Sequence, residues 1–218
     1  MEQPVQGATL YYDVISPFAY LMHARLRQEP LPVPVRAKPL LFAGLLKAHA
    51  HKGPAEIARK RVFTYEFCTW WAAEHGIAFR MPARHPFNPL RYLRLIAAAD
   101  DDAALVERIF TLLFSTGADP DDPALFESLL TSPVLRAAAQ RIDSDAVKAR
   151  IRANTDEALA QGVFGVPTLL IGKQLFWGVD ALPMARSYLR NDAIFSSTAM
   201  RAASAVQDGV RRRQLDAL

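Results

Sequence analysis

Apolar and polar residues follow a strand pattern at both ends of the chain and a helical pattern between them. Residues 9–14 are β-branched and aromatic, which is typical of a short buried strand. From Pro39 onward the apolar residues recur every three or four positions for more than a hundred residues, and this spacing predicts a series of helices. Strand character returns only after residue 165, in two short runs separated by Gly172-Lys173, which predicts a hairpin.

Breaks in the periodicity at Gly, Pro and Asp residues divide the chain into elements. Strands are expected at 9–14, 33–37, 166–171 and 174–177. Helices are expected at 18–28, 39–48, 54–75, 87–99, 102–116, 122–130, 133–139, 143–161, 180–189 and 198–213. Residues 79–81 form a further short extended piece, and Pro34 makes the second strand an edge strand because proline has no N–H for the ladder.

A strand, a helix and a strand at the start, with a hairpin and a helix at the end, describe a thioredoxin-like α/β fold. The right-handed crossover of the first parallel pair puts the first helix on one face of the sheet. We expect residues 8–38 and 163–190 to form the thioredoxin-like domain and residues 39–162 to form an all-helical insertion domain. Residues 191–218 are then a C-terminal helical tail.

Composition and charge exclude several kinds of protein. The 218 residues are 51% hydrophobic and 22% charged, which suits a folded core and argues against long disorder. The net charge is only +4 and no compact basic stripe is interleaved with aromatic residues, so nucleic-acid binding is not expected. Neither a basic and apolar leader nor an apolar run of membrane-spanning length is found, and we expect a cytoplasmic protein without a membrane partner. The one macromolecular partner that the sequence still allows is a second copy of the chain, which would form a homodimer.

The start of the first helix is the first informative site. Ser is a preferred N-cap and Pro fits the first helical position, so Ser16-Pro17 marks the junction of strand and helix. A helix N-terminus offers free N–H groups and a partial positive charge, which suits an anion such as a thiolate. Taken alone, Ser16 is more simply explained as a helix cap.

The second informative site is Val166-Pro167, at the start of a predicted inner strand. One interpretation is a cis bond before Pro167. Such a bond would make a tight turn and leave the backbone N–H and C=O of Val166 free to pair with an extended peptide. From the residues alone, an ordinary trans proline opening an edge strand is the simpler interpretation.

Six groups of residues, taken together, resemble one known family. They are Asp13, Ser16, Pro17 and Tyr20; Lys52-Gly53-Pro54-Ala55-Glu56 with Lys60; Trp71-Ala72 with Gly76-Ile77; His85-Pro86-Phe87-Asn88-Pro89-Leu90 with Arg94; Gly165-Val166-Pro167-Thr168; and Phe176-Trp177-Gly178-Val179-Asp180. In this order and spacing they resemble the 2-hydroxychromene-2-carboxylate isomerases and kappa-class glutathione transferases, over roughly residues 8–190. The resemblance implies a DsbA-like thioredoxin fold with a helical insertion, and glutathione as the cofactor.

The resemblance also implies roles for particular residues. Ser16 faces the glutathione sulfur as the catalytic residue, Val166 pairs with the tripeptide backbone, and Pro167 is cis. The segment that holds the γ-glutamyl end of glutathione consists of Trp177, Gly178, Val179 and Asp180, with Asp180 as the anchor of the ammonium group. The implied substrate-binding residues are His51, Lys52, Lys60, His85 and Asn88. Two of these positions depart from the family: Val179 stands where members often have Asn or Ser, and His51 where the kappa class tends to have Asn.

Cysteine content limits the chemistry of the chain itself. The positions that carry Cys-x-x-Cys in an oxidoreductase of this fold are Ser16-Pro17-Phe18-Ala19, so thiol–disulfide exchange at this site is excluded. The single cysteine, Cys68, lies between aromatic residues and is expected to be buried. His49 and His51 have no Cys or acidic partner at ligand spacing, so no metal is expected. The useful thiol must therefore arrive with glutathione.

Three functions remain open at this point. The first is a glutathione-dependent isomerase, in which the thiolate adds reversibly to a conjugated aromatic carboxylate. The second is a kappa-class-like transferase acting on an aromatic electrophile, and the third is a glutathione-binding module without catalysis. Turnover of an electrophilic alkene that depends on the thiol distinguishes the enzymes from the binding module.

Overall fold

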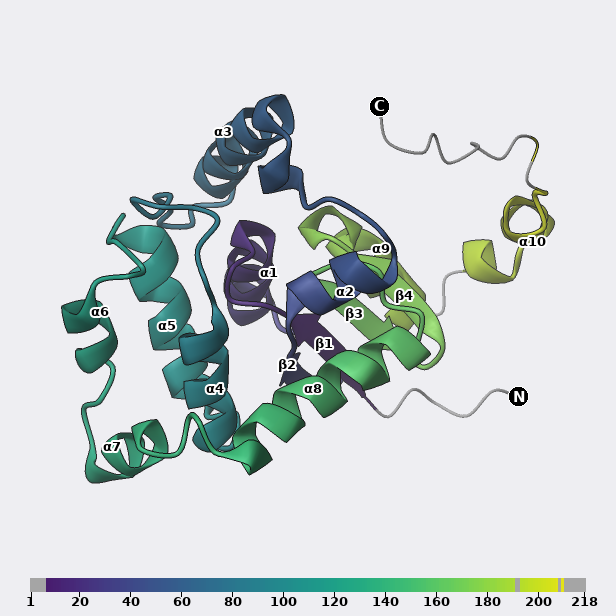
Figure 1. The fold of residues 1–218 in the computed structure, drawn as a ribbon. Helices are drawn as coiled ribbons and strands as arrows, with labels where there is room; N and C mark the ends of the chain where they lie inside the picture. Colours follow the sequence, from purple (N-terminus) through teal and green to yellow (C-terminus); the bar gives the residue numbers. More distant parts are fainter. Residues whose placement is uncertain (1–6, 191–192, 208, 210–218) are drawn as a thin grey trace, which may run out of the picture.

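A mixed β-sheet forms the centre of the computed structural model, which describes residues 7–190, 193–207 and 209. Within these residues the sheet has four strands in the order β2-β1-β3-β4 (Figure 1). The strands are β1 (Ala8–Tyr12), β2 (Val35–Pro39), β3 (Thr168–Ile171) and β4 (Gln174–Trp177). β1 is parallel to β2 and antiparallel to β3, which forms a hairpin with β4. The expected thioredoxin-like α/β fold is confirmed, with β2 at one edge.

Helices make up most of the remaining described chain. They are α1 (Pro17–Gln28), α2 (Phe42–Ala48), α3 (Ala58–Glu74), α4 (Leu90–Ala98), α5 (Ala103–Ser115), α6 (Pro123–Glu127), α7 (Pro133–Ala139), α8 (Asp145–Ala160), α9 (Leu182–Leu189) and α10 (Thr198–Ser204). Short 3₁₀ turns are η1 (Pro54–Glu56), η2 (Val179–Ala181) and η3 (Ala193–Ser196). Every described helix is too short or too polar to cross a bilayer.

Several predicted elements have other bounds in the structure, and four of the differences have a visible cause or consequence. The helix expected at 54–75 is divided into η1 and α3 because Ile57 has an extended backbone. The helix expected from residue 39 begins at Phe42, since Pro39 still pairs with β1. Residues 79–81 form no strand, although the Arg80 N–H donates to the Phe114 carbonyl at 2.7 Å. The helix expected at 198–213 ends at Ser204, and most of the residues expected to follow lie outside the described part.

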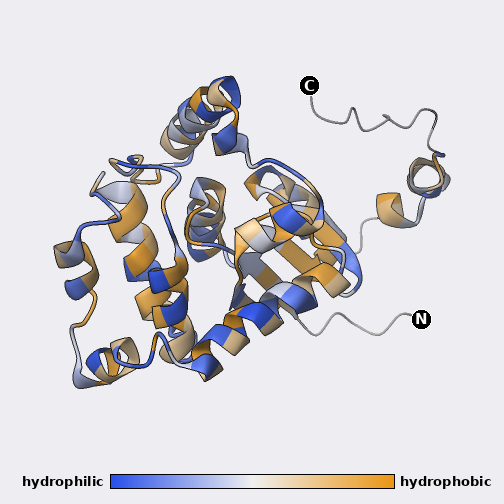
Figure 2. Cartoon of the chain, viewed as in Figure 1, coloured by the Kyte–Doolittle hydropathy of each residue, from blue (hydrophilic) through white to orange (hydrophobic). Residues whose placement is uncertain are grey.

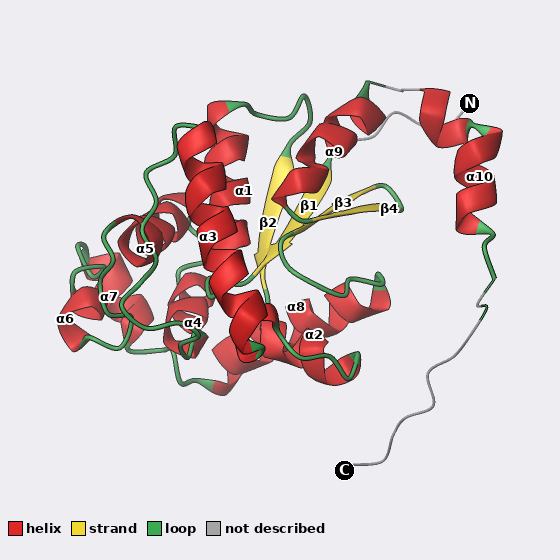
Figure 3. Cartoon of the chain, turned by 90° about the horizontal axis from the view of Figure 1, so that it is seen from above, coloured by secondary structure: helices red, strands yellow, loops and turns green. Residues whose placement is uncertain are grey.

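The two faces of β1 bury different layers of helices. Tyr11 points to a cluster that includes Leu45 of α2 and Ala158 of α8. Leu10 and Tyr12 point the other way, into the larger core that contains α1 and α9. Figure 3 shows the same arrangement, with α2 and α8 on one side of the strands and α1 and α9 on the other. The alternation of side chains along a strand therefore produces a three-layer domain.

The larger core continues from the sheet into the helices between residues 58 and 139. Tyr12 of β1 and Tyr20 of α1 both pack against Phe110 of α5, with ring centroids 5.7 and 6.1 Å apart. Figure 2 shows that apolar residues are frequent along α4 and α5 in this part of the molecule. This packing holds α1 firmly between the sheet and the helical part, and so fixes the position of its N-terminus.

Candidate active site

The sheet brings three separate parts of the sequence to one end. Tyr11 of β1 lies opposite Thr168 of β3, and Thr168 lies opposite Trp177 of β4. The loop after β1, the residues before β3 and the segment after β4 therefore meet at the same end of the sheet. This end contains the α1 N-terminus, and η2 packs directly against α1.

Ser16 caps α1 and keeps a free hydroxyl proton. The Ser16 backbone is extended, as is usual for an N-cap residue, and the Ser16 Oγ accepts the N–H of Ala19 at 3.2 Å. Within the described residues no group accepts the Ser16 hydroxyl proton, and the Phe18 N–H also has no partner. Pro17 has no N–H to satisfy. Two donors and the positive end of the helix dipole are thus available to an anion at this position.

Asp13 holds the loop before Ser16. Its carboxylate is completely buried and accepts the N–H of Ile15 at 3.0 Å and the N–H of Phe42 at 2.8 Å. Burial raises the pKa of Asp13 to about 7, while the two backbone hydrogen bonds lower it. The side chain therefore ties the start of α1 to the start of α2. Sequence reasoning placed Asp13 only in a motif, because its partner Phe42 is distant in the sequence.

The peptide bond between Val166 and Pro167 is cis. This corrects the simpler interpretation from the residues alone, which assumed an edge strand, because β3 lies inside the sheet between β1 and β4. The Thr168 hydroxyl donates to the Gly165 carbonyl at 2.8 Å, and the Gly178 N–H donates to the Pro167 carbonyl at 2.9 Å. In the described part of the chain, neither the N–H nor the C=O of Val166 has a hydrogen-bond partner. An extended peptide has an unused pair of backbone groups to bind here.

The segment after β4 leaves a carboxylate unpaired. Gly178 has φ of +87°, and a Cβ there would lie 2.3 Å from Asp180 Oδ1, so only glycine fits. Val179 is buried, whereas Asp180 is exposed. No described residue forms a hydrogen bond or an ion pair with the Asp180 carboxylate, and it does not cap η2 or α9. The carboxylate is therefore available to a cationic group.

Two aromatic side chains, Phe164 and Trp177, lie next to the backbone that leads into Val166. Trp177 is 54% exposed and meets Phe164 edge to face, with ring centroids 5.1 Å apart. A Cβ at Gly165 would lie 2.5 Å from Trp177 Nε1, so the glycine allows the indole to lie against the backbone before Val166.

Both ring nitrogens of His85 have hydrogen-bond partners within the protein. Its Nε2 lies 2.8 Å from the Ile15 carbonyl, which can only accept, so Nε2 carries the proton. In the neutral ring Nδ1 is then an acceptor, and the Tyr65 hydroxyl lies 2.6 Å from it. Burial lowers the pKa of His85. This side chain ties α3 to the residue before Ser16, and the bond between His85 and Pro86 is also cis. Sequence analysis missed both the Tyr65 partner and this second cis bond.

The other residues expected to bind substrate lie in different segments of the chain. The Asn88 Oδ1 accepts the Leu90 N–H at 3.1 Å at the start of α4, beside a small hollow that it lines with Arg91 and Asp121. His51 and Lys52 are exposed in the loop after α2, and Lys60 is exposed in the first turn of α3. The expectation that Cys68 is buried holds, since its side chain is completely buried. On the same helix Trp71 is buried, whereas Trp70 is 56% exposed.

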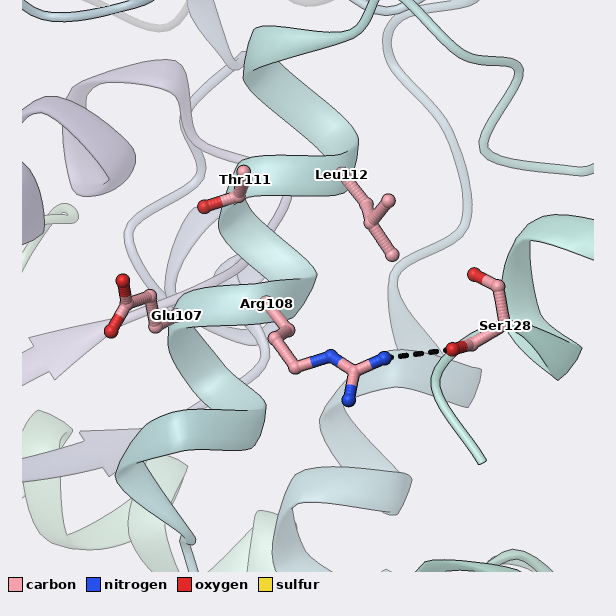
Figure 4. A pocket seen from close by; sticks show the side chains of 5 residues that line it. All are labelled: Glu107, Arg108, Thr111, Leu112 and Ser128. Carbon is pink, nitrogen blue, oxygen red and sulfur yellow. Dashed lines mark hydrogen bonds between the residues drawn. The ribbon is translucent and has the colours of Figure 1, made fainter. Parts of the chain in front are cut away.

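A larger open hollow of about 420 Å³ lies on the outer side of α5, away from this site. It is lined by Glu107, Arg108, Thr111, Leu112 and Ser128 (Figure 4). Glu107 forms an ion pair with Arg27, which is near the C-terminal end of α1. Because α1 has 12 residues and rises about 1.5 Å per residue, the hollow is roughly one helix length from Ser16. It therefore takes no part in the chemistry at the α1 N-terminus.

Fold and site together define a thioredoxin-fold protein whose α1 N-terminus and cis-proline segment lie at the same end of the sheet, with serine rather than cysteine at the start of α1. The model of the DsbA-like thioredoxin domain matches residues 9–190, and the chain belongs to this family. Within it, the curated relatives place the chain with the 2-hydroxychromene-2-carboxylate isomerases and kappa-class glutathione transferases.

Relatives and a solved structure support this placement. A 2-hydroxychromene-2-carboxylate isomerase from Pseudomonas sp. (strain C18) is 30% identical over 185 residues, which are 80% of this chain and 85% of the relative. Glutathione S-transferase kappa 2 from Caenorhabditis elegans is 28% identical over 202 residues, 82% and 89% of the two chains. A solved structure of 2-hydroxychromene-2-carboxylate isomerase superposes with a TM-score of 0.71 at 23% identity, covering 92% of this chain and all of that one.

Proposed function

We propose that the protein is a glutathione-dependent isomerase of the 2-hydroxychromene-2-carboxylate type. The observation that carries this proposal is the set of unused groups at one end of the sheet: the Ser16 hydroxyl proton, the Phe18 N–H and the backbone of Val166. These groups match an extended peptide that carries an anionic sulfur. When bound, glutathione supplies a thiolate that adds to a conjugated double bond, allows rotation about it and is expelled again, so that the thiol is not consumed.

Ser16 and Phe18 act on the sulfur. The Ser16 hydroxyl donates its proton in a hydrogen bond that favours the thiolate over the neutral thiol. The Phe18 N–H and the helix dipole act in the same direction. Because the Ala19 N–H is already bonded to Ser16 Oγ, the serine side chain is held in place for this contact.

Val166 and Asp180 act on the peptide part. The N–H and C=O of Val166 pair with the tripeptide backbone as a neighbouring strand would. The Asp180 carboxylate receives the γ-glutamyl ammonium in a charge-assisted bond. The exposed Trp177 covers the peptide from the solvent side. Gly178 and the buried Val179 fix the backbone conformation that directs Asp180 toward the ammonium group.

A turnover assay with a blocked thiol tests the proposal. Isomerisation of 2-hydroxychromene-2-carboxylate is followed by ultraviolet absorbance with reduced glutathione, without any thiol, and with S-methylglutathione. We expect turnover only with reduced glutathione, and competitive inhibition by the S-methyl compound, which keeps the peptide but cannot form a thiolate. Equal rates with and without the thiol would contradict the mechanism, and tight binding without turnover would leave only a binding module.

A transferase is the second candidate, and the kappa-class relative favours it. The same residues would activate the same thiolate, and the two reactions differ in the fate of the thiol. Free thiol titrated during turnover stays constant for the isomerase and falls in step with product for the transferase. In either case the reactive form of glutathione is the reduced thiol, which agrees with the cytoplasmic location expected from the sequence.

A further inference from the structure

The peptide group between Ile15 and Ser16 is held at both ends. Its carbonyl oxygen lies 2.8 Å from Nε2 of His85, and its N–H donates to the Asp13 carbonyl at 3.1 Å. The N–H of Ile15 donates to the Asp13 carboxylate at 3.0 Å. A peptide group is planar, so fixing its C=O and its N–H also fixes the direction in which the chain enters Ser16. The place of the Ser16 hydroxyl follows from that direction.

Two of these hydrogen bonds connect the loop before Ser16 to distant parts of the protein. The Asp13 carboxylate also accepts the N–H of Phe42 at 2.8 Å, which connects the loop to the start of α2. His85 is 70 residues away from Ile15 in the sequence and lies between α3 and α4, so it connects the loop to the helical part. The position of Ser16 relative to the rest of the site therefore depends on His85 as well as on Asp13.

Tyr65 of α3 holds the imidazole in the tautomer that the contact with Ile15 needs. Its hydroxyl lies 2.6 Å from Nδ1 of His85 and 3.0 Å from the His85 carbonyl, and the two rings meet edge to face at 5.2 Å. Burial raises the pKa of Tyr65, so the hydroxyl keeps its proton. In the neutral ring this proton is donated to Nδ1, which leaves the proton of the ring on Nε2, where it faces Ile15.

The same pair keeps the contact when the ring gains a second proton. Nδ1–H then donates to the Tyr65 oxygen, and the Tyr65 proton turns to the His85 carbonyl, which is already within reach. Nε2–H donates to Ile15 in both states. The peptide group before Ser16 is therefore held in the same way whatever the charge on His85.

We propose that His85 and Tyr65 are positioning residues for Ser16. Through the Ile15 carbonyl they hold the Ser16 hydroxyl where it donates to the glutathione sulfur. In this role His85 acts on the protein backbone rather than on the substrate. The inference rests on the proposed function, because the sulfur is the group toward which the hydroxyl is directed. Without the pair, Ser16 still caps α1 through the Ala19 N–H, but its hydroxyl is held less firmly toward the sulfur.

A double-mutant cycle separates positioning from direct contact with the sulfur. The pKa of the thiol of bound glutathione is measured by ultraviolet titration, beside turnover at pH 7, for the parent, His85→Phe, Ser16→Ala and the double variant. His85→Phe should raise the thiol pKa by no more than Ser16→Ala does, and should lower turnover about three- to tenfold. The double variant should titrate like Ser16→Ala alone, because no hydroxyl is left for His85 to position.

Three further variants test the hydrogen bonds themselves. His85→Gln keeps an N–H near the position of Nε2 and should restore most of the turnover that His85→Phe loses. Tyr65→Phe removes the group that fixes the tautomer and should lose less than His85→Phe. His75→Phe is the matched control, because His75 at the end of α3 also contacts a backbone carbonyl at 2.8 Å, that of Trp71. This control should leave the thiol pKa unchanged.

Two results overturn the positioning role. One is a thiol pKa and a turnover in His85→Phe equal to those of the parent. The other is a double variant whose thiol pKa rises by the sum of the two single effects, which would mean that His85 acts without Ser16. If His85→Phe does not fold, Tyr65→Phe takes its place in the cycle with the same expectations. Failure of the proposed function is distinguishable, because the parent itself then binds no glutathione thiolate, and the positioning role falls with it.

Discussion

Replacing Ser16 by alanine separates the role of this residue as a helix cap from its role at the thiolate. The substitution removes the hydroxyl that donates to the sulfur but leaves the Phe18 N–H and the helix dipole in place. A hydrogen bond to a charged group contributes about 1.5–3 kcal/mol, and one pKa unit corresponds to about 1.36 kcal/mol. Because the second donor remains, we expect the lower end: the pKa of the bound thiol rises by about one unit.

Activity should follow the thiolate fraction. A free cysteine thiol ionises near about 8.5, so at pH 7 a rise of one unit lowers the reactive fraction roughly tenfold. Turnover of Ser16→Ala should therefore fall about tenfold at pH 7 and recover substantially near pH 9. Ser16→Thr keeps the hydroxyl and should lose less. The measurement is an ultraviolet titration of the thiolate of bound glutathione, set beside the pH–rate profile of each variant.

Ser132→Ala is the matched control. Ser132 caps α7 as Ser16 caps α1, since its Oγ accepts the Leu135 N–H at 3.2 Å. Both alanine variants lose an N-cap worth about 0.5–2 kcal/mol of stability, so both should unfold at lower temperature. Only Ser16→Ala should change the titration of bound glutathione. If Ser16→Ala titrates and turns over like the parent at pH 7, then Ser16 is only a cap and the mechanism is wrong.

Three further predictions concern other residues. Asp180→Asn should weaken glutathione about tenfold or more by calorimetry, because it loses a charge-assisted bond of about 1.5–3 kcal/mol; an unchanged affinity would remove Asp180 from the γ-glutamyl site. The pKa of Asp13 is raised from 3.8 to about 7, so the folded state binds more protons than the unfolded state between these values. Urea unfolding should then show stability falling as the pH rises from about 4 to about 7, by at most about 1.36 kcal/mol per unit, and Asp13→Asn should flatten this slope even if it is less stable overall. Burial raises the pKa of the Cys68 thiol to about 12, so iodoacetamide at pH 8 should label Cys68 in urea but not in the folded protein, and rapid native labelling would refute its burial.

The sequence by itself determined the elements whose signals are local. The Ser16-Pro17 start of α1 depends on a cap and a fixed φ within three residues, and the structure has the helix begin there. The turn at Gly172 between β3 and β4 is equally local, and glycine supplies the positive φ of +61° that it needs. The order of strands and helices followed from these signals and from hydrophobic spacing. It was enough to define the thioredoxin-like sheet, and the motifs placed along it pointed to the family.

Only the tertiary structure decided which groups at the site are used and which are free. Asp13 forms a hydrogen bond with Phe42, 29 residues away, and His85 forms one with Ile15, 70 residues away. Neither hydrogen bond can be predicted from a local sequence pattern. Whether Pro167 opens an edge or an inner strand depends on β1 and β4 lying on either side of β3. Which aromatic side chains of α3 are exposed, such as Phe63 and Trp70, likewise depends on which face of the helix packs against the core. Side chains at such positions are assigned by contacts between distant parts of the chain, because a hydrogen-bond donor is free or occupied only in relation to its neighbours in space.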